Sequence, residues 1–176
     1  HLSIRRQRQM CIRDRCMSNQ NYSHKTKVIA ALLTLPCYRR PMEKRRAGSS
    51  GLELSRLGLG TMTWGRDTDE IEAADQCRAY LDAGGNFLDT SPTYGDGDSE
   101  RLIGGLISTL FKRDEVVIAS KAGINLNENS RRVNATRQFL ISDLDRTLER
   151  LGTDFVDLWQ VHNWDELTPI DETLSA

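Results

Sequence analysis

The stretch that decides the fold of this chain is Asn86-Phe87-Leu88-Asp89-Thr90-Ser91-Pro92-Thr93-Tyr94-Gly95. It opens with a short apolar run that follows two glycines, and this run is too short for a helix. We interpret residues 86–90 as a strand that passes through Asp89 and enters a loop carrying Tyr94. In α/β folds the chemistry lies at the carboxyl ends of the strands. The stretch therefore predicts a functional site that includes an acid and a phenol.

Two later strands have the same form. Residues 116–120 are an apolar run that leads into Lys121, and residues 155–161 lead into His162. An earlier strand is predicted at 56–61. Helices are predicted at 69–83, 100–111 and 135–151, and a further helix starts at 168–171. This alternation predicts a parallel sheet with right-handed crossovers, so the reactive side chains should gather at one edge of the sheet.

Apolar spacing adds detail to this outline. Residues 42–47 and 52–57 flank a Gly-Ser-Ser-Gly turn and are predicted to form a β-hairpin. Cys77 lies within the helix at 69–83 and is expected to be a small buried hydrophobe. The expected buried faces of the next two helices consist of Leu102, Ile103, Leu106, Ile107 and Leu110 in one and Leu140, Leu144, Leu148 and Leu151 in the other.

Charge is unevenly distributed over the 176 residues. Residues 1–41 hold nine Lys or Arg and one acid, a balance of +8, whereas residues 42–176 hold fifteen and twenty-four, a balance of −9. Residues 1–16 have no apolar period and resemble translated adaptor sequence, and residues 25–37 are shaped like a short secretory signal. We expect residues 1–41 to be a non-native or disordered leader and Met42 to start one domain that runs to residue 176.

Other motifs in the sequence are weaker signals. Gly58, Gly60 and Gly65 suggest a dinucleotide fingerprint, but position 63 is Thr63, so G-x-G-x-x-G is not present. The acidic run 96–100 suggests a calcium loop, yet no bidentate glutamate follows at the required spacing, and a helix start is the better interpretation. The chain has no C-x-x-C pair, so no metal site is predicted. Only Cys77 lies beyond residue 41, which argues against a disulfide framework and favours a cytoplasmic protein.

Over residues 42–176 these motifs resemble the aldo-keto reductase family, in particular its bacterial members. The motifs that carry the resemblance are Gly58-Leu59-Gly60-Thr61-Met62, Asp89-Thr90 with Tyr94-Gly95, Ser120-Lys121, Leu148-Glu149-Arg150-Leu151-Gly152-Thr153-Asp154 and Gln160-Val161-His162. The resemblance implies an α/β fold, the (β/α)8 TIM barrel, of which this chain would hold the N-terminal half behind an N-terminal β-hairpin. It also implies a catalytic set consisting of Asp89, Tyr94, Lys121 and His162.

The family reduces aldehydes or ketones to alcohols with a hydride from NADPH, and these side chains suit that chemistry. A carbonyl that accepts hydride becomes an alkoxide and needs a proton, which Tyr94 can donate as general acid. A free phenol has a pKa of about 10, so a neighbouring Lys121 ammonium helps by stabilising the phenolate. Asp89 is expected to pair with Lys121, because a buried unpaired ammonium tends to lose its proton. His162 is expected to orient the carbonyl oxygen.

The resemblance further implies that Gly60, Thr61, Met62 and Asp89 lie near the NADPH cofactor and that Trp64 walls the substrate pocket. Most cofactor contacts of the family come from the fifth to eighth units, so we expect residues 1–176 alone to be an inactive fragment. The expected partner is a small-molecule carbonyl compound, with neither nucleic acid nor membrane. Two alternatives stay open: a regulatory protein like the potassium-channel β subunits, which retain the same four residues, and a nucleic-acid binder built on the basic residues 1–41.

Overall fold

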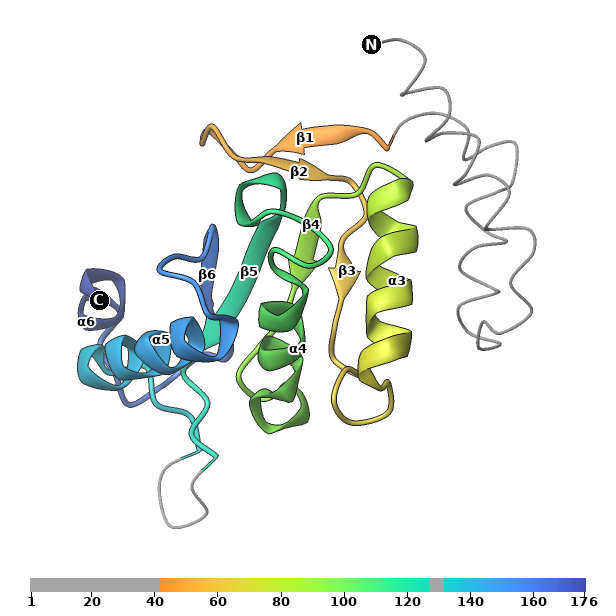
Figure 1. Cartoon of the computed structure of the whole chain (residues 1–176). Coiled ribbons are helices and arrows are strands. Elements are labelled where there is room, and N and C mark those ends of the chain that lie inside the picture. The colour runs from red at the N-terminus through yellow and green to blue at the C-terminus, as the bar shows by residue number, and fades with distance from the viewer. Residues whose placement is uncertain (1–41, 127–131) are drawn as a thin grey trace, which may run out of the picture.

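The computed structural model describes residues 42–126 and 132–176, so the predicted leader, residues 1–41, lies outside the described residues. The described part begins with a hairpin of β1 (Lys44–Arg46) and β2 (Glu53–Ser55). Strands and helices then alternate (Figure 1), in the order β3 (Leu59–Gly60), α3 (Glu70–Asp82), β4 (Phe87–Asp89), α4 (Asp98–Leu106), β5 (Val117–Ala122), α5 (Arg137–Leu151), β6 (Leu158–Val161) and α6 (Ile170–Ser175).

The four strands from β3 to β6 form one parallel sheet in chain order. In the register, Gly60 pairs with Asp89, Asp89 with Ala119, and Lys121 with Gln160. A parallel sheet whose strands follow one another in sequence, each joined to the next by a helix, is the arrangement of part of a (β/α)8 barrel. The predicted α/β class is therefore confirmed, and the carboxyl ends of all four strands lie at the same edge.

The hairpin covers the opposite end of the sheet, where the strands begin (Figure 1). Asn86, directly before β4, fixes it there: its Oδ1 accepts a hydrogen bond from the backbone N–H of Ser55 at 2.7 Å, and its Nδ2 donates to the carbonyl of Glu53 at 3.0 Å. The hydroxyl of Tyr80, from α3, lies 2.7 Å from Ser55 Oγ. The predicted hairpin is thus present, and it closes the end of the sheet that is remote from the reactive side chains.

Helix α3 begins close to its predicted start, whereas α4 both begins and ends earlier than predicted. Asp69 caps α3 by accepting a hydrogen bond from the backbone N–H of Glu72 at 2.9 Å. The helix predicted at 100–111 instead ends at Leu106, because Ile107 is extended and Ser108 has a φ of 68°. The chain then turns back and places Phe111 in the core with 6% exposure. None of the helices in the described ranges is long and apolar enough to cross a membrane.

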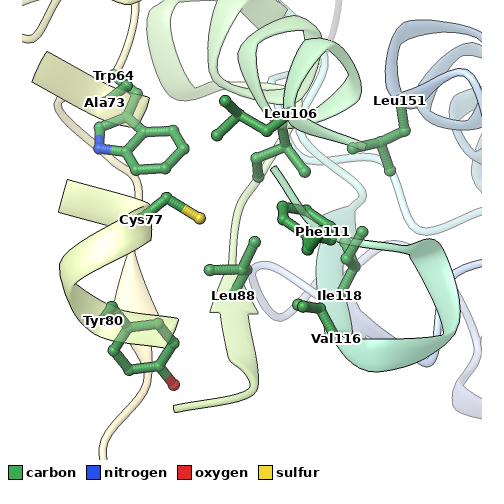
Figure 2. Close-up of a cluster of buried hydrophobic side chains, with 11 residues drawn as sticks. Trp64, Ala73, Cys77, Tyr80, Leu88, Leu106, Phe111, Val116, Ile118 and Leu151 are labelled. Atoms are coloured by element: carbon green, nitrogen blue, oxygen red, sulfur yellow. The ribbon is translucent and has the colours of Figure 1, made fainter. Parts of the chain in front are cut away.

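Apolar side chains from α3, α4, β4, β5 and the end of α5 meet in one core (Figure 2), which contains Trp64, Ala73, Cys77, Tyr80, Leu88, Ile103, Leu106, Phe111, Val116, Ile118 and Leu151. Burial of a large aliphatic side chain stabilises a fold by about 1.5–3 kcal/mol. Cys77 is fully buried, as expected, and burial raises the pKa of its thiol to about 12. It is therefore a core residue and not a reactive thiol.

Helix α4 packs on both α3 and α5. A Cβ added to Gly104 would lie 2.8 Å from the carbonyl oxygen of Arg150 and 2.9 Å from that of Leu151. These oxygens belong to the last turn of α5, and backbone cannot move aside as a flexible side chain can. Gly104 therefore sets how closely the two helices approach each other.

Candidate active site

Lys121, on β5, is the centre of the predicted site. Its Nζ donates hydrogen bonds to Asp89 Oδ2 at 2.8 Å, to the carbonyl oxygen of Thr90 at 2.9 Å and to the hydroxyl of Tyr94 at 3.2 Å. An ammonium has three protons to donate, so all of its donors are used. The Lys121 side chain is only 13% exposed, while that of Asp89 is 31% exposed. The lysine is thus held in one position by a carboxylate that still reaches solvent.

Tyr94 stands at the start of a short 3₁₀ turn, Tyr94–Gly97, in the loop after β4. Gly95 has a φ of 58°, and a Cβ there would lie 2.9 Å from the carbonyl oxygen of Trp64. Glycine therefore allows this loop to pack against the segment after β3, and the phenol is directed toward Lys121. The Lys121 Nζ also lies 4.8 Å from the centre of the Tyr94 ring.

His162 follows β6, and its backbone N–H continues the ladder by donating to the carbonyl of Ala122 at 2.8 Å. Its ring meets the Tyr94 ring edge to face, with centroids 6.2 Å apart. Burial lowers the pKa of His162 below its usual value, the Lys121 ammonium lowers it further, and Asp89 partly opposes both. The imidazole is therefore neutral at pH 7, where it can donate or accept one hydrogen bond at each nitrogen.

The structure thus brings the four predicted residues together from three strand ends. A phenol held by an ammonium, with a neutral imidazole beside it, can donate a proton to an oxygen that gains negative charge. All four side chains are half-buried at an open edge. A hollow of about 550 Å³ lies nearby, between the loop after β3 and α4, but Arg66, Glu72 and Arg101 line it and none of these four residues does.

Beneath these four residues lies a layer of buried hydroxyls that the sequence analysis missed. Ser99 Oγ, in the first turn of α4, lies 2.6 Å from Thr61 Oγ1 and 2.9 Å from Thr90 Oγ1, and Thr61 Oγ1 donates to the carbonyl of Asp89 at 3.0 Å. All three hydroxyl-bearing residues have 0% exposure. The first turn of α4 therefore ties the end of β3 to the end of β4, directly below Asp89.

Glu100, the next residue of α4, makes the corresponding contacts to β5 and α5. It is fully buried, and it accepts hydrogen bonds from Ser120 Oγ at 2.6 Å, Thr147 Oγ1 at 3.0 Å and Arg150 Nε at 2.6 Å. Ser120 directly precedes Lys121. One signal in the sequence could have identified this group: Ser99 and Glu100 fall on the apolar side of α4, in line with Ile103 and Leu106.

The residues predicted to lie near a cofactor fall into two groups. Thr61 is fully buried, and its hydroxyl, backbone N–H and carbonyl are all engaged in hydrogen bonds, so it exposes no atom to a ligand. Met62 is 54% exposed, and a Cβ on Gly60 would meet no atom within 4 Å. Gly60 and Asp89 are paired in the sheet. Open surface therefore adjoins the site at the end of β3.

Trp64, predicted to wall the substrate pocket, lies elsewhere. Figure 2 shows its indole in the core beside Ala73, and its exposure is 0%. The indole N–H donates to Gln76 Oε1 on α3 at 3.0 Å, which satisfies the buried donor. The chain turns after Thr61 and carries Trp64 beneath the loop. The expectation for this residue is therefore corrected: its side chain packs between the loop and α3.

The aldo/keto reductase family matches residues 56–176. Aldo-keto reductase YhdN of Bacillus subtilis (strain 168) is 40% identical over 137 residues, which cover 75% of this chain and 41% of YhdN. L-glyceraldehyde 3-phosphate reductase of Escherichia coli (strain K12) is 35% identical over 143 residues, covering 77% and 40%. Aldo-keto reductase AKR11C1 from Bacillus halodurans, in its holo form, has a TM-score of 0.68 at 32% identity, covering 76% of this chain and 44% of that chain.

The chain therefore spans about two fifths of the length of these relatives. Probable voltage-gated potassium channel β subunits of Oryza sativa and Arabidopsis thaliana also match, so similarity alone does not separate an enzyme from a regulatory subunit. The matched region contains all four residues that meet at the strand ends. Sequence match, fold and the order of the strand ends agree: this chain belongs to the aldo/keto reductase family.

Proposed function

We propose that the protein that contains this chain is an oxidoreductase that reduces an aldehyde or ketone to an alcohol with a hydride from NADPH, and that Tyr94 is its general acid. The three-way contact of Lys121 Nζ with Asp89, Thr90 and Tyr94 carries the proposal. It fixes a positive charge beside the phenol of Tyr94, and a phenol needs such a neighbour to release its proton readily at neutral pH.

The residues of this chain handle the proton. When bound, NADPH supplies the hydride that adds to the carbonyl carbon. The O–H bond of Tyr94 breaks, and its proton moves to the carbonyl oxygen, which becomes the hydroxyl of the product. The phenolate left on Tyr94 is stabilised by Lys121 Nζ at 3.2 Å until solvent returns a proton. Asp89 keeps the lysine charged and in place.

Exposure and ring geometry suggest where the cofactor and the substrate would bind. The exposed ends at Gly60 and Met62 adjoin Asp89 and are proposed to face the nicotinamide. His162 is proposed to orient the carbonyl oxygen, because its ring stands edge to face with Tyr94. A small-molecule carbonyl compound is the proposed partner, which agrees with the name of the relative L-glyceraldehyde 3-phosphate reductase. A cytoplasmic setting is also proposed, since Cys77 is a buried free thiol.

The test is Tyr94→Phe in a protein of full family length that contains these residues. The ring still fills its space, but the transferable proton is gone, so turnover should fall by about 10²–10⁴-fold while NADPH affinity stays unchanged. Turnover is measured by oxidation of NADPH with an aldehyde substrate, and affinity by quenching of NADPH fluorescence. A variant that retains more than about a tenth of the normal turnover would show that Tyr94 is not the general acid.

A further inference from the structure

Ser91 lies two residues after Asp89, and its hydroxyl contacts the ring of His162. Its side chain is fully buried, and Ser91 Oγ lies 3.2 Å from His162 Nδ1. Within residues 42–126 and 132–176 no group hydrogen-bonds the other ring nitrogen, Nε2. The imidazole is therefore anchored at one nitrogen, while the other stays available for a ligand.

The hydrogen bonds at Ser91 Oγ restrict where the protons can be. A hydroxyl donates one hydrogen bond and accepts two. The backbone N–H of Thr93 donates to Ser91 Oγ at 3.2 Å, and Thr93 Oγ1 lies 2.9 Å away. With one acceptor site already used, Oγ has one donor and one acceptor left for two neighbours. Either Thr93 donates to Ser91 and Ser91 donates to His162 Nδ1, or both of these bonds run the other way.

The two arrangements present different atoms to a substrate. If Ser91 donates to Nδ1, a neutral imidazole carries its proton on Nε2 and can donate to a carbonyl oxygen. If Nδ1 donates to Ser91, Nε2 has only a lone pair, which repels the same oxygen. Charging the ring would also force the second direction, because both nitrogens of a protonated imidazole are donors. Burial and Lys121 both disfavour the charged ring.

We propose that Ser91 is a positioning residue that donates its hydroxyl proton to Nδ1 of neutral His162 and so keeps the ring proton on Nε2, facing the carbonyl oxygen of the substrate. Thr93 completes the chain by donating to Ser91. Both the role assigned to Nε2 and the chosen direction of the Ser91–His162 hydrogen bond rest on the proposed function, because the geometry allows either direction. Specificity for a carbonyl acceptor is thereby set from a residue that never touches the substrate.

The first test reads the position of the proton directly. In the full-length protein with ¹⁵N-labelled histidine, the nitrogen shifts of His162 are assigned by their loss in His162→Gln, at a pH where the ring is neutral. The proton should be on Nε2 in the unaltered protein, and Ser91→Ala should give a mixture of both tautomers. A proton on Nδ1 in the unaltered protein overturns the proposal, and so does a pure Nε2 tautomer in Ser91→Ala.

The second test reads the kinetic consequence. Ser91→Ala should lower kcat by about 3- to 10-fold, the range expected for one neutral hydrogen bond, and change KM little, because the contact from Nε2 strengthens as charge develops on the oxygen. Thr93→Val is the matched control: it removes a hydroxyl from the same chain but leaves Ser91 able to donate, so its effect on kcat should be smaller. An equal or larger loss in Thr93→Val contradicts the proposal.

The two tests separate failure of this inference from failure of the proposed function. The tautomer measurement needs no substrate and gives the same answer whether or not the protein is a reductase. If Tyr94→Phe retains turnover but the tautomer follows Ser91, the proposed function fails and the hydrogen-bond direction stands. If Tyr94→Phe abolishes turnover and the proton lies on Nδ1, the proposed function stands and the inference about Ser91 fails.

Discussion

Two ion pairs of similar length contact neighbouring residues of β5: one contains Lys121, and the other accepts a hydrogen bond from Ser120 through Glu100. The two pairs differ in what surrounds them. Lys121 and Asp89 are 2.8 Å apart, with side chains 13% and 31% exposed, while Arg150 and Glu100 are 2.6 Å apart, with side chains 16% and 0% exposed. In the first pair the carboxylate reaches solvent. In the second pair the carboxylate is fully buried.

The partners of each pair show what this difference means. Lys121 donates one of its three hydrogen bonds to Tyr94, the group proposed to react. Glu100 accepts hydrogen bonds from Ser120, Thr147 and Arg150, and so links α4 to β5 and α5. A buried charge is costly to leave unpaired, whereas a carboxylate at a surface regains water when its partner is lost. The first pair should therefore matter to turnover and the second to stability.

The largest expected effect on stability comes from Glu100→Ala. This change leaves the Arg150 guanidinium, Ser120 and Thr147 without their common acceptor, so the free energy of unfolding should fall by about 3–5 kcal/mol. Urea unfolding of the full-length protein followed by circular dichroism measures it. Glu100→Gln is the matched control, because it keeps the volume and one carbonyl acceptor, and it should cost less. A loss below about 1 kcal/mol in Glu100→Ala would remove the contrast with a surface pair.

Lys121→Met should have a large effect on turnover and a small effect on the free energy of unfolding. Turnover should fall by at least about 10²-fold, because the phenolate of Tyr94 loses its stabilising charge. The free energy of unfolding should change by about 1 kcal/mol or less, since Asp89 returns to water. The measurements are NADPH oxidation and urea unfolding on the same preparation. Lys121→Arg keeps a charge with a different shape and should retain part of the activity. If Lys121→Met destabilises the protein as strongly as Glu100→Ala, the division between the two pairs is wrong.

The smallest effect expected is a pH dependence that belongs to His162. Because its pKa in the folded protein lies below 6.5, the folded state binds fewer protons than the unfolded state in the interval beneath that value. Stability from this residue is therefore fully present above pH 6.5 and is lost as the pH falls toward the folded pKa. Urea unfolding at about pH 5 and about pH 8 should show a modest loss in acid that shrinks in His162→Gln. An unchanged loss in that variant would assign it to other groups.

The sequence predicted the first pair and missed the second, and the reason is physical. Asp89, Lys121 and His162 follow apolar runs, and parallel strands end at one edge, so topology alone brings them together. Helix faces follow a weaker rule. Leu144 and Leu148 were expected to be buried but are only half-buried, while Asp143 and Thr147 of the same helix are buried. An apolar period assigns polar residues to solvent, and it cannot show that a hydroxyl or carboxylate has a buried partner.

The same limit explains Trp64 and the end of α4. An aromatic residue just past a strand end is a reasonable pocket wall until the turn after Thr61 is known. In that turn the backbone N–H of Trp64 donates to the carbonyl of Thr61, and the indole reaches Gln76, twelve residues away. Leu110 and Phe111 continue the apolar spacing of α4, but the backbone at Ser108 takes a left-handed conformation and ends the pattern. Apolar spacing predicts which residues are buried. It does not predict the path by which the chain brings them into the core.

The first turn of α4 also has a consequence for how this part of the fold can vary. Ser99 joins the ends of β3 and β4, Glu100 joins β5 to α5, and Gly104 sets the distance to the last turn of α5. A single substitution at Ser99 or Glu100 leaves several partners unmatched, and a side chain at Gly104 would clash with α5. Tolerated changes should therefore come in sets: Ser99 with Thr61, or Glu100 with Arg150. Among homologues, such positions should covary as pairs, and the alignment of the strand ends should change in discrete steps as sequences diverge.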